Sequence, residues 1–297
     1  MNLIDNMNLM KKNIGFIGAG FMGYGIAKNL IINKFSLKVI AHKNRKPIEK
    51  LVNEGANEVI SYTELFSSDL DCLMICVTNT SIALSIAEQI LPLIKNKILF
   101  IDLTTHNKDG TSKMKKILSS DIISYTVCPV TGGPVQSEEG TLGGIWGGDI
   151  DNFKNSKKYL LCFCKNVFNF GTVENATKAK LLSNFLSLLT TTTVIEFFKS
   201  AKKLDINIKL LCDVARLGSG NSGALDRIAD KAIKGNYKGY VFSVDNTYKD
   251  LNYINDLVSD LPNANKLSKM AKSFYKQASK KGFGDLLVSE LIDKEKY

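Results

Sequence analysis

The sequence predicts an α/β fold: a Rossmann domain with a doubly wound, mostly parallel sheet, joined by a long helix to an all-α domain. Three observations indicate this fold. Short apolar runs alternate with helical patterns in the first half, a glycine-rich turn follows the first apolar run, and the second half consists of helical patterns. With 297 residues and a hydrophobic fraction of 44%, the chain is long enough for two domains with separate cores.

Five apolar runs rich in Val, Ile and Leu are expected to be strands of one sheet. Between the third and fourth runs, Ile82, Ile86 and Ile90 recur at helical spacing. Continuous apolar strands that alternate with helices are typical of a parallel sheet covered on both faces. The expected strands are 13–17, 37–41, 71–77, 97–103 and 122–127.

The second half opens with one long helix, expected over 174–204, which has an apolar and a polar stripe. We therefore expect an NAD(P)-binding Rossmann domain over 1–173 and a helical domain for substrate binding and oligomerisation over 174–297. The apolar stripe comprises Leu182, Phe185, Leu186 and Leu189, and the polar stripe comprises Lys180, Asn184, Ser187 and Thr191.

Composition excludes several other classes of function. The net charge of +10 is spread along the chain without a nucleic-acid motif, so no nucleic-acid partner is expected. The sequence shows no uninterrupted apolar run of about 20 residues and no secretory signal, which favours a cytoplasmic protein that does not contact a membrane. Cys162 and Cys164 form a C-x-C pair without a second pair, so we expect buried reduced thiols and no metal.

A G-x-G-x-x-G motif stands between the first expected strand and a helical pattern. Gly18 allows the tight turn, Gly20 lets a pyrophosphate approach the backbone, and Gly23 lets helix and strand pack closely. The phosphates then meet free N–H groups at the start of the helix. A tight turn without a ligand is the alternative. The predicted cofactor-binding residues here are Gly18, Ala19, Gly20, Phe21, Met22 and Gly23.

The residues after the second strand bear on the choice between NAD and NADP. NAD usually meets an acidic residue there, but Ala41 stands at that position and is followed by His42, Lys43 and Arg45. Nothing anionic repels a 2′-phosphate, and three basic groups are present to receive it. The sequence predicts NADP as the preferred cofactor; NAD, and an exposed basic loop without a ligand, are the alternatives.

Four motifs in order, within residues 13–291, resemble those of the β-hydroxyacid dehydrogenase family, which includes 3-hydroxyisobutyrate dehydrogenase and short-chain semialdehyde reductases. They are "GFIGAGFMGYGIAKNL" (15–30), "CPVTGGPVQSEEGTLGGIWGG" (128–148), "FGTVENATKAKLLSN" (170–184) and "FSVDNTYKDLNYI" (242–254). Together they are specific for the superfamily and say little about the substrate.

The sequence departs from the family pattern at several positions. Val127 stands where the family usually has an acidic residue, and Thr131 replaces a serine. Glu174 and Ala176 replace glycines, and Ser183 replaces the first of two asparagines. These departures bear on the identity of the substrate more than on catalysis.

The resemblance implies that Lys180 is the catalytic general acid and base. Lys180 and Asn184 are four residues apart on one helix and so face the same way. An ammonium and an amide together are suited to hold and protonate an alkoxide. A surface lysine on an amphipathic helix is the alternative. The family mechanism uses neither histidine, His42 or His106, as a base, and it needs no metal.

The substrate loop is expected at Thr131, Gly132 and Gly133, where a hydroxyl and backbone N–H groups form a donor cluster suited to a carboxylate. A plain turn is the alternative. Asn221 and Ser222 lie in a second glycine-rich loop, which we expect to close over the substrate.

Further cofactor contacts are expected where strands end, because doubly wound sheets bind ligands at their carboxyl edge. Val77 and Asn79 close one strand and Thr105 follows the next, where helix capping is the alternative for Thr105. The family pattern also implies that Lys249 reaches cofactor or substrate and that Asp250 orients it; a charged helix face is the alternative.

These observations predict an NADP-preferring oxidoreductase that interconverts a small anionic 3-hydroxy acid and its semialdehyde or keto acid. Two alternatives use the same scaffold. One is an imine reductase, which retention of Lys180 disfavours, and the other is a non-catalytic dinucleotide-sensing module. A homodimer or homotetramer is expected by family analogy alone.

Overall fold

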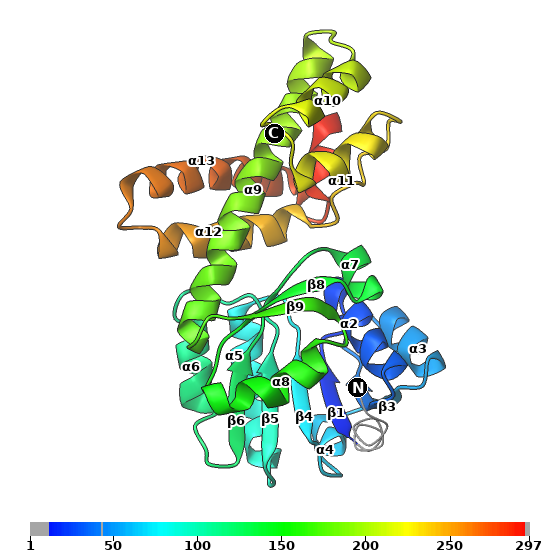
Figure 1. Cartoon of the computed structure of the whole chain (residues 1–297), viewed down its shortest axis with the longest axis vertical. Helices are drawn as coiled ribbons and strands as arrows, with labels where there is room; N and C mark the ends of the chain where they lie inside the picture. Colours follow the sequence, from blue (N-terminus) through cyan, green and yellow to red (C-terminus); the bar gives the residue numbers. More distant parts are fainter. Residues whose placement is uncertain (1–11, 43, 295–297) are drawn as a thin grey trace. The chain divides into compact units, whose positions relative to one another are not determined.

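The structure, a computed structural model, describes residues 12–42 and 44–294. The chain divides into two compact units, Met1–Lys180 and Leu181–Tyr297. The division falls inside the long helix α9 (Val173–Lys203), which begins in the first unit and continues into the second (Figure 1). Its bounds confirm the expected long helix.

Six parallel strands form the main sheet of the first unit, in the order β3-β2-β1-β4-β5-β6 (Figure 1). At the centre, Ile14 of β1 lies opposite Leu37 of β2 on one side and Cys72 of β4 on the other. The strand order reverses between β1 and β4, which confirms the doubly wound topology. The strands are β1 (Asn13–Ile17), β2 (Ser36–Ile40), β3 (Asn57–Val59), β4 (Cys72–Ile75), β5 (Ile98–Asp102) and β6 (Ile123–Val127).

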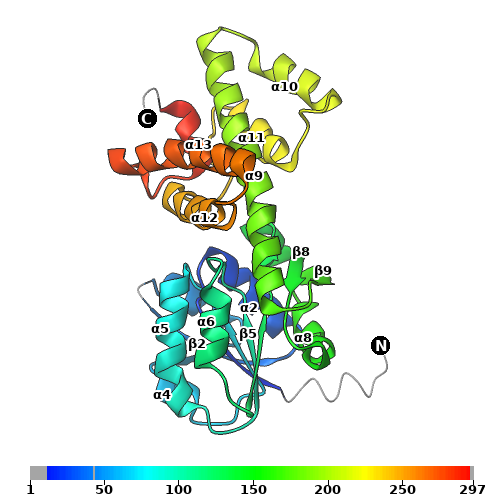
Figure 2. The same ribbon diagram turned by 90° about the vertical axis from the view of Figure 1, so that its left-hand side faces the viewer.

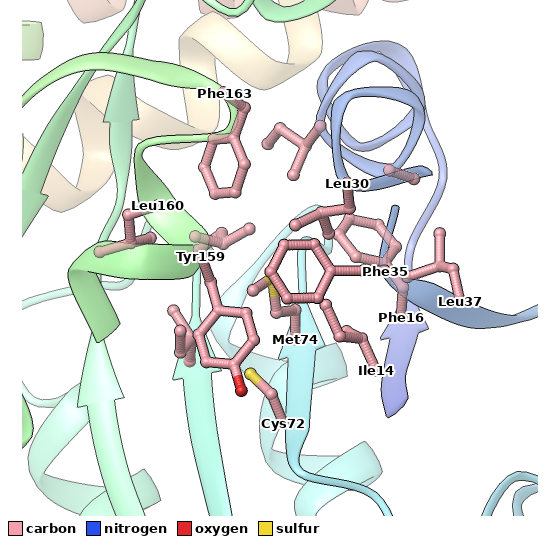
Figure 3. Packing of buried hydrophobic residues seen from close by; sticks show 14 of the residues in the cluster. Ile14, Phe16, Leu30, Phe35, Leu37, Cys72, Met74, Tyr159, Leu160 and Phe163 are labelled. Atoms are coloured by element: carbon pink, nitrogen blue, oxygen red, sulfur yellow. The ribbon is translucent and has the colours of Figure 1, made fainter. Parts of the chain in front are cut away.

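Both faces of this sheet are buried, because alternate side chains of each strand point to opposite sides. On one face Phe16 packs among Leu30 and Tyr159 (Figure 3). On the other face, Ile75 and Phe100 pack against helices. The first face carries α2 (Phe21–Ile32), α3 (Lys46–Asn53) and α8 (Phe153–Leu160), and the second carries α4 (Tyr62–Leu65), α5 (Thr80–Ile90) with the 3₁₀ turn η1 (Leu91–Leu93), and α6 (Gly110–Ile117).

A second, three-stranded sheet in the first unit is not expected from the sequence. It contains β7 (Val130–Thr131), β8 (Leu142–Trp146) and β9 (Cys164–Asn169), in the order β7-β8-β9. Strand β8 is antiparallel to β7 and parallel to β9. α7 (Pro134–Glu139) connects β7 to β8, and the turn η2 (Ile150–Asn152) precedes α8. A bridge between Val127 and Gly147 ties this sheet to the end of β6.

The second unit is helical, as expected. In both views its helices surround the later part of α9 (Figures 1 and 2). Leu188, Ile195 and Phe198 of α9 are buried in its core. The helices are α10 (Ile208–Leu217), α11 (Gly223–Ala232), α12 (Val244–Leu257) and α13 (Pro262–Ala278), followed by the short turns η3 (Ser279–Phe283) and η4 (Val288–Asp293).

The prediction of which side of α9 is buried is wrong in part. Leu182 and Leu186 are 49% and 72% exposed. Thr191, expected on the polar stripe, is buried instead, and its hydroxyl donates to the carbonyl of Ser187 at 2.7 Å. The helix has apolar residues around most of its circumference, so periodicity alone does not identify its buried side.

By length and mean hydropathy, α9 would be able to cross a membrane, and 39% of its most apolar 18-residue window is buried. One such helix is weak evidence for a membrane span, because the core helix of a soluble protein has the same properties.

Candidate functional site

The turn between β1 and α2 has the backbone that a dinucleotide requires. Gly18 has φ +104°, and a Cβ added there would lie 2.2 Å from the carbonyl oxygen of Cys76. A Cβ on Gly23 would lie 1.9 Å from the carbonyl oxygen of Gly18. Around Gly20, by contrast, an added Cβ would meet nothing within 4 Å. The outer glycines are therefore required by the fold, and Gly20 faces open space.

The N-terminus of α2 offers donors to a ligand. Gly20 is its N-cap residue and provides no side-chain cap. In the first turn of a helix, the N–H groups have no intrahelical acceptor. These groups at Phe21, Met22 and Gly23 therefore fit a pyrophosphate, which the helix dipole also favours.

Hydrogen bonds clamp α2 to α7, the helix that follows the expected substrate loop. The hydroxyl of Ser137 donates to the carbonyl of Met22 at 2.6 Å. The side-chain amide of Asn29 donates to the carbonyls of Ser137 and Glu138, at 2.9 and 3.1 Å. The structure therefore holds the cofactor helix and the helix that follows the substrate loop together. Sequence reasoning missed Ser137, since a lone serine in a polar segment gives no signal.

The loop at 131–133 is only partly as expected. Gly132 has φ +124°, a conformation that favours glycine, and Thr131 and Gly132 are exposed. The N–H of Gly133, however, donates to the side-chain oxygen of Gln136 at 2.9 Å. Of the two predicted backbone donors, the Gly133 N–H is thus engaged within the loop. Gln136, which the sequence did not single out, controls its availability.

Lys180 lies beside this loop. Its side chain is buried, and Nζ donates to the carbonyl of Val130 at 2.8 Å. Val130 directly precedes Thr131, so the structure brings the predicted acid–base group to the predicted substrate loop. One turn earlier in α9, the hydroxyl of Thr177 bonds that of Thr111 in α6 at 3.0 Å, which fixes this part of the helix.

The ends of β4 and β5 are joined by side chains. The N–H of Val77 donates to Oγ1 of Thr104 at 3.3 Å, and the partly exposed Thr105 follows. Asn79 is the N-cap of α5, where Oδ1 accepts from the N–H of Ile82 at 3.0 Å. Asn79 therefore has a structural role in addition to its expected cofactor contact.

The cysteine at this edge is not a nucleophile. Burial and, to a smaller extent, the nearby charge of Asp102 raise the pKa of Cys76 to about 12. The thiol is consequently protonated near neutral pH.

The basic loop after β2 differs from expectation at Arg45. Its guanidinium makes two contacts with the carboxylate of Glu58, at 2.9 and 3.0 Å. A bidentate pair of this kind must open before Arg45 is available to a phosphate. His42 is exposed, Ala41 directly follows β2, and Lys43 lies outside the described residues.

Three predicted residues of the second unit lie together, while Asn221 and Ser222 lie at the start of α11. The side-chain amide of Asn184 donates to Oδ2 of Asp250 at 2.8 Å. Nζ of Lys249 lies 2.9 Å from Oδ1 of the same carboxylate, which is buried. Ser222 caps α11, with its hydroxyl accepting from the N–H of Leu225 at 3.2 Å, and Asn221 precedes it in the loop. Asp250 thus links Asn184 to Lys249.

Family models match both parts of this chain. The NAD-binding domain of 6-phosphogluconate dehydrogenase matches residues 13–171, and the NAD-binding domain of NADP-dependent 3-hydroxyisobutyrate dehydrogenase matches residues 175–294. The chain belongs to the β-hydroxyacid dehydrogenase family. Its two domains are NAD(P)-binding domains of the 3-hydroxyisobutyrate dehydrogenase type, and the turn at Gly18–Gly23 fits the dinucleotide.

Relatives of this chain include 3-hydroxyisobutyrate dehydrogenases and N-PAC proteins. The mitochondrial 3-hydroxyisobutyrate dehydrogenase of Drosophila melanogaster is 24% identical over 96% of this chain and 91% of its own length. The cytokine-like nuclear factor N-PAC of Anopheles gambiae is 25% identical over 95% of this chain. The chain spans 50% of the length of this N-PAC relative.

Solved structures confirm the fold over nearly the whole chain. 3-Hydroxyisobutyrate dehydrogenase of Mycobacterium tuberculosis with L-serine has a TM-score of 0.82 at 21% identity, and covers 96% of this chain and 99% of that chain. The Salmonella typhimurium enzyme of the same name has a TM-score of 0.86 at 22% identity, covering 95% and 99%. Psf3 in complex with NADP⁺ and 2-OPP has a TM-score of 0.83 at 20% identity, covering 94% and 99%.

Proposed function

We propose that this protein is an NADP-preferring enzyme that interconverts a small 3-hydroxy acid and its semialdehyde or keto acid. The observation that carries the proposal is the position of Lys180, whose buried ammonium donates to Val130 beside Thr131 and Gly132. A proton donor thereby stands next to groups suited to a carboxylate.

Each side chain has a distinct part in the proposed reaction. When held by the turn at Gly18–Gly23, the dinucleotide would supply hydride transfer to or from the substrate carbon. Lys180 takes the proton of the substrate hydroxyl in oxidation and returns it to the oxygen in reduction. The hydroxyl of Thr131 and the N–H of Gly132 hold the carboxylate, and Asn184, one turn beyond Lys180 in α9, orients the oxygen.

Lysine favours alcohol chemistry over imine reduction, because an ammonium protonates the developing alkoxide directly. The imine reductase from Pseudomonas sp. shares the fold with a TM-score of 0.54 at 16% identity, below the values for the two dehydrogenases. That likeness concerns the fold alone.

A non-catalytic, dinucleotide-sensing module is the second candidate. The similarity to N-PAC over 95% of the chain is the observation that favours it. Lys180 argues for catalysis, since a module that only senses a dinucleotide has no need for a buried proton donor at the substrate loop.

A screen of NADPH consumption distinguishes these candidates. The purified protein is assayed with glyoxylate and with succinic, methylmalonic and tartronic semialdehydes, and in reverse with 3-hydroxyisobutyrate and its relatives. We expect turnover of at least one carboxylate-bearing substrate. NADPH binding without turnover of any of them would favour the sensing module.

The cofactor preference is tested by kcat/KM with NADP(H) and NAD(H). We expect a higher value with NADP(H), because no carboxylate follows β2 and basic groups do. Lys43→Ala should lower kcat/KM with NADP(H) by about 10-fold or more, since a charge-assisted contact contributes about 1.5–3 kcal/mol. It should leave kcat/KM with NAD(H) nearly unchanged.

Arg45→Ala is the matched variant, and we expect a smaller effect because Arg45 is paired with Glu58. Equal use of both cofactors by the unmodified protein would contradict the proposed preference.

We also propose that the chain forms a homodimer or homotetramer through its helical unit. Exposed apolar side chains on α10 support this proposal: Leu210 and Val214 are 61% and 67% exposed, and Leu217 is 91% exposed. Contiguous exposed apolar side chains are typical of interaction surfaces.

A further inference from the structure

A buried acid–histidine pair lies at the carboxyl end of β5, and the proposed reaction does not use it. Asp102 ends the strand and is 0% exposed, and His106, four residues on, is 2% exposed. Nε2 of His106 lies 2.8 Å from Oδ2 of Asp102. The pair occurs in a loop rather than a helix, so its four-residue spacing gives no signal in the sequence.

The carboxylate of Asp102 accepts three hydrogen bonds. Oδ2 accepts from Nε2 of His106 and, at 3.2 Å, from the hydroxyl of Tyr125 in β6. Oδ1 accepts from the N–H of Thr104 at 2.9 Å. A buried carboxylate requires such donors, because an unpaired charge in the interior is strongly unfavourable.

This arrangement assigns His106 its tautomer. All three bonds are satisfied when Nε2 carries the proton and donates to Asp102. Among the described residues, the buried Nδ1 has no hydrogen-bond partner. A second N–H there would be an unsatisfied buried donor, so the neutral ring with a bare Nδ1 fits the surroundings best.

The loop above the pair is connected to the predicted cofactor edge. Thr104, held by Asp102, accepts from the N–H of Val77. Asn107, which follows His106, donates from its N–H to Oγ1 of Thr80 at 3.0 Å. The segment between β5 and α6 is therefore joined at two points to its neighbours, Val77 after β4 and Thr80 at the start of α5, and Thr105 lies between these two hydrogen bonds.

The imidazole also fills a defined space. A Cβ added to Gly110, the first residue of α6, would lie 2.8 Å from Nδ1 of His106 and 2.9 Å from its Cβ. The ring is thus enclosed between the strand end and the start of α6. It has no route to a substrate, which excludes it as an acid or base and leaves a positioning role.

We propose that His106 and Asp102 are positioning residues that fix the conformation of the β5–α6 loop and thereby set the affinity for the dinucleotide. The inference rests on the proposed function insofar as Val77 and Thr105 contact the cofactor. It predicts an effect on cofactor binding, with little effect on the chemical step.

The test compares three purified full-length variants by direct titration with NADPH, followed by steady-state kinetics. His106→Leu keeps much of the volume and removes the donor to Asp102. His106→Gln restores an N–H donor on a side chain of similar reach. Tyr125→Phe removes only the longer bond to Asp102 and is the matched control.

For His106→Leu we expect an NADPH Kd and KM raised by about 10-fold or more, and a kcat at saturating cofactor within about 3-fold of the unmodified protein. His106→Gln and Tyr125→Phe should stay within about 3-fold in Kd. An unchanged Kd in His106→Leu, or an equal loss in His106→Gln, would overturn the proposal. Should His106→Leu fail to fold, Asp102→Asn, which is isosteric and lacks the charge, must raise the Kd in the same way or the proposal fails.

Direct binding separates this inference from the proposed function. If the unmodified protein binds NADPH but turns over no substrate, the proposed reaction fails while the Kd comparison still decides the role of His106. If it turns over a substrate and His106→Leu binds NADPH normally, only the positioning role fails.

Discussion

Lys180 is the residue on which the proposed chemistry depends. The residue is 9% exposed, and its ammonium group donates to the carbonyl of Val130. General acid–base groups typically contribute 10²–10⁴-fold to rate, about 3–5 kcal/mol of barrier. Lys180→Ala should lower kcat by about this factor and leave NADPH affinity, measured by fluorescence, nearly unchanged.

Arginine at the same position separates proton transfer from charge attraction. Lys180→Arg should be nearly as inactive as Lys180→Ala, since guanidinium keeps the charge but does not release a proton near neutral pH. Lys178→Ala, on an exposed position of the same helix, is the control and should be fully active. More than about a tenth of normal activity in Lys180→Arg would make the lysine an electrostatic anchor, with Lys249 the next candidate for the acid.

Gly132 is the residue that tests the carboxylate site. A methyl group there would lie 2.7 Å from Leu142 and beside the N–H offered to the substrate. Gly132→Ala should raise the substrate KM by about 10-fold or more and keep cofactor affinity within a few-fold.

Gly171 provides a matched control for that variant. It also has a positive φ, +81°, and an added Cβ would meet nothing within 4 Å. Gly171→Ala therefore imposes similar backbone strain away from the loop. If both variants change the substrate KM equally, the loop is only a turn.

At the scale of elements, the β1–α2 turn contains one glycine that we expect to matter for cofactor binding, Gly20, and one that the fold requires, Gly18. Gly20→Val places its side chain in open space, so the melting temperature should change little while NADPH affinity falls by about 10-fold or more. Gly18→Val should unfold the turn, because its Cβ would overlap the carbonyl of Cys76. Thermal unfolding and NADPH titration measure both effects. Normal NADPH binding by Gly20→Val would show that the open space is not the pyrophosphate site.

Sequence patterns predicted those elements whose burial is uniform. β4 and β5 are apolar at nearly every position because both sheet faces are covered, which gives a strong signal. The residues of β9 alternate little between apolar and polar, and most of them are exposed. β8 contains two glycines. Neither strand was therefore identified as part of a second sheet. In α9, apolar residues on several sides concealed the buried face.

The candidate site was predicted where a local motif defines it and missed where the packing of individual side chains decides. The residues of the turn at Gly18–Gly23 are neighbours in the sequence, so the motif can be recognised from the sequence alone. The bond between Gly133 and Gln136, the pair of Arg45 with Glu58, and the enclosure of His106 depend on packing that spacing does not encode.

At the scale of the whole molecule, each compact unit contains some of the residues that the sequence predicts to be functional. Lys180 ends the first unit and Asn184 belongs to the second, and the continuous helix α9 carries both. The glycine turn and the substrate loop lie in the first unit, and Lys249 and Asp250 lie in the second.

The proposed assembly is the last property to test at this scale. Light scattering coupled to size exclusion should give a mass of two or four times the 32.8 kDa of one chain. Leu210 and Val214 are one turn apart on α10, so the double variant Leu210→Glu/Val214→Glu places two charges on one exposed face. If that face forms the interface, buried like charges should dissociate the assembly toward monomer. Ile60→Glu, at an 88% exposed position of the first unit, is the control and should keep the assembly. A monomeric unmodified protein would contradict the assembly itself, and an intact assembly in the double variant would exclude α10 from the interface.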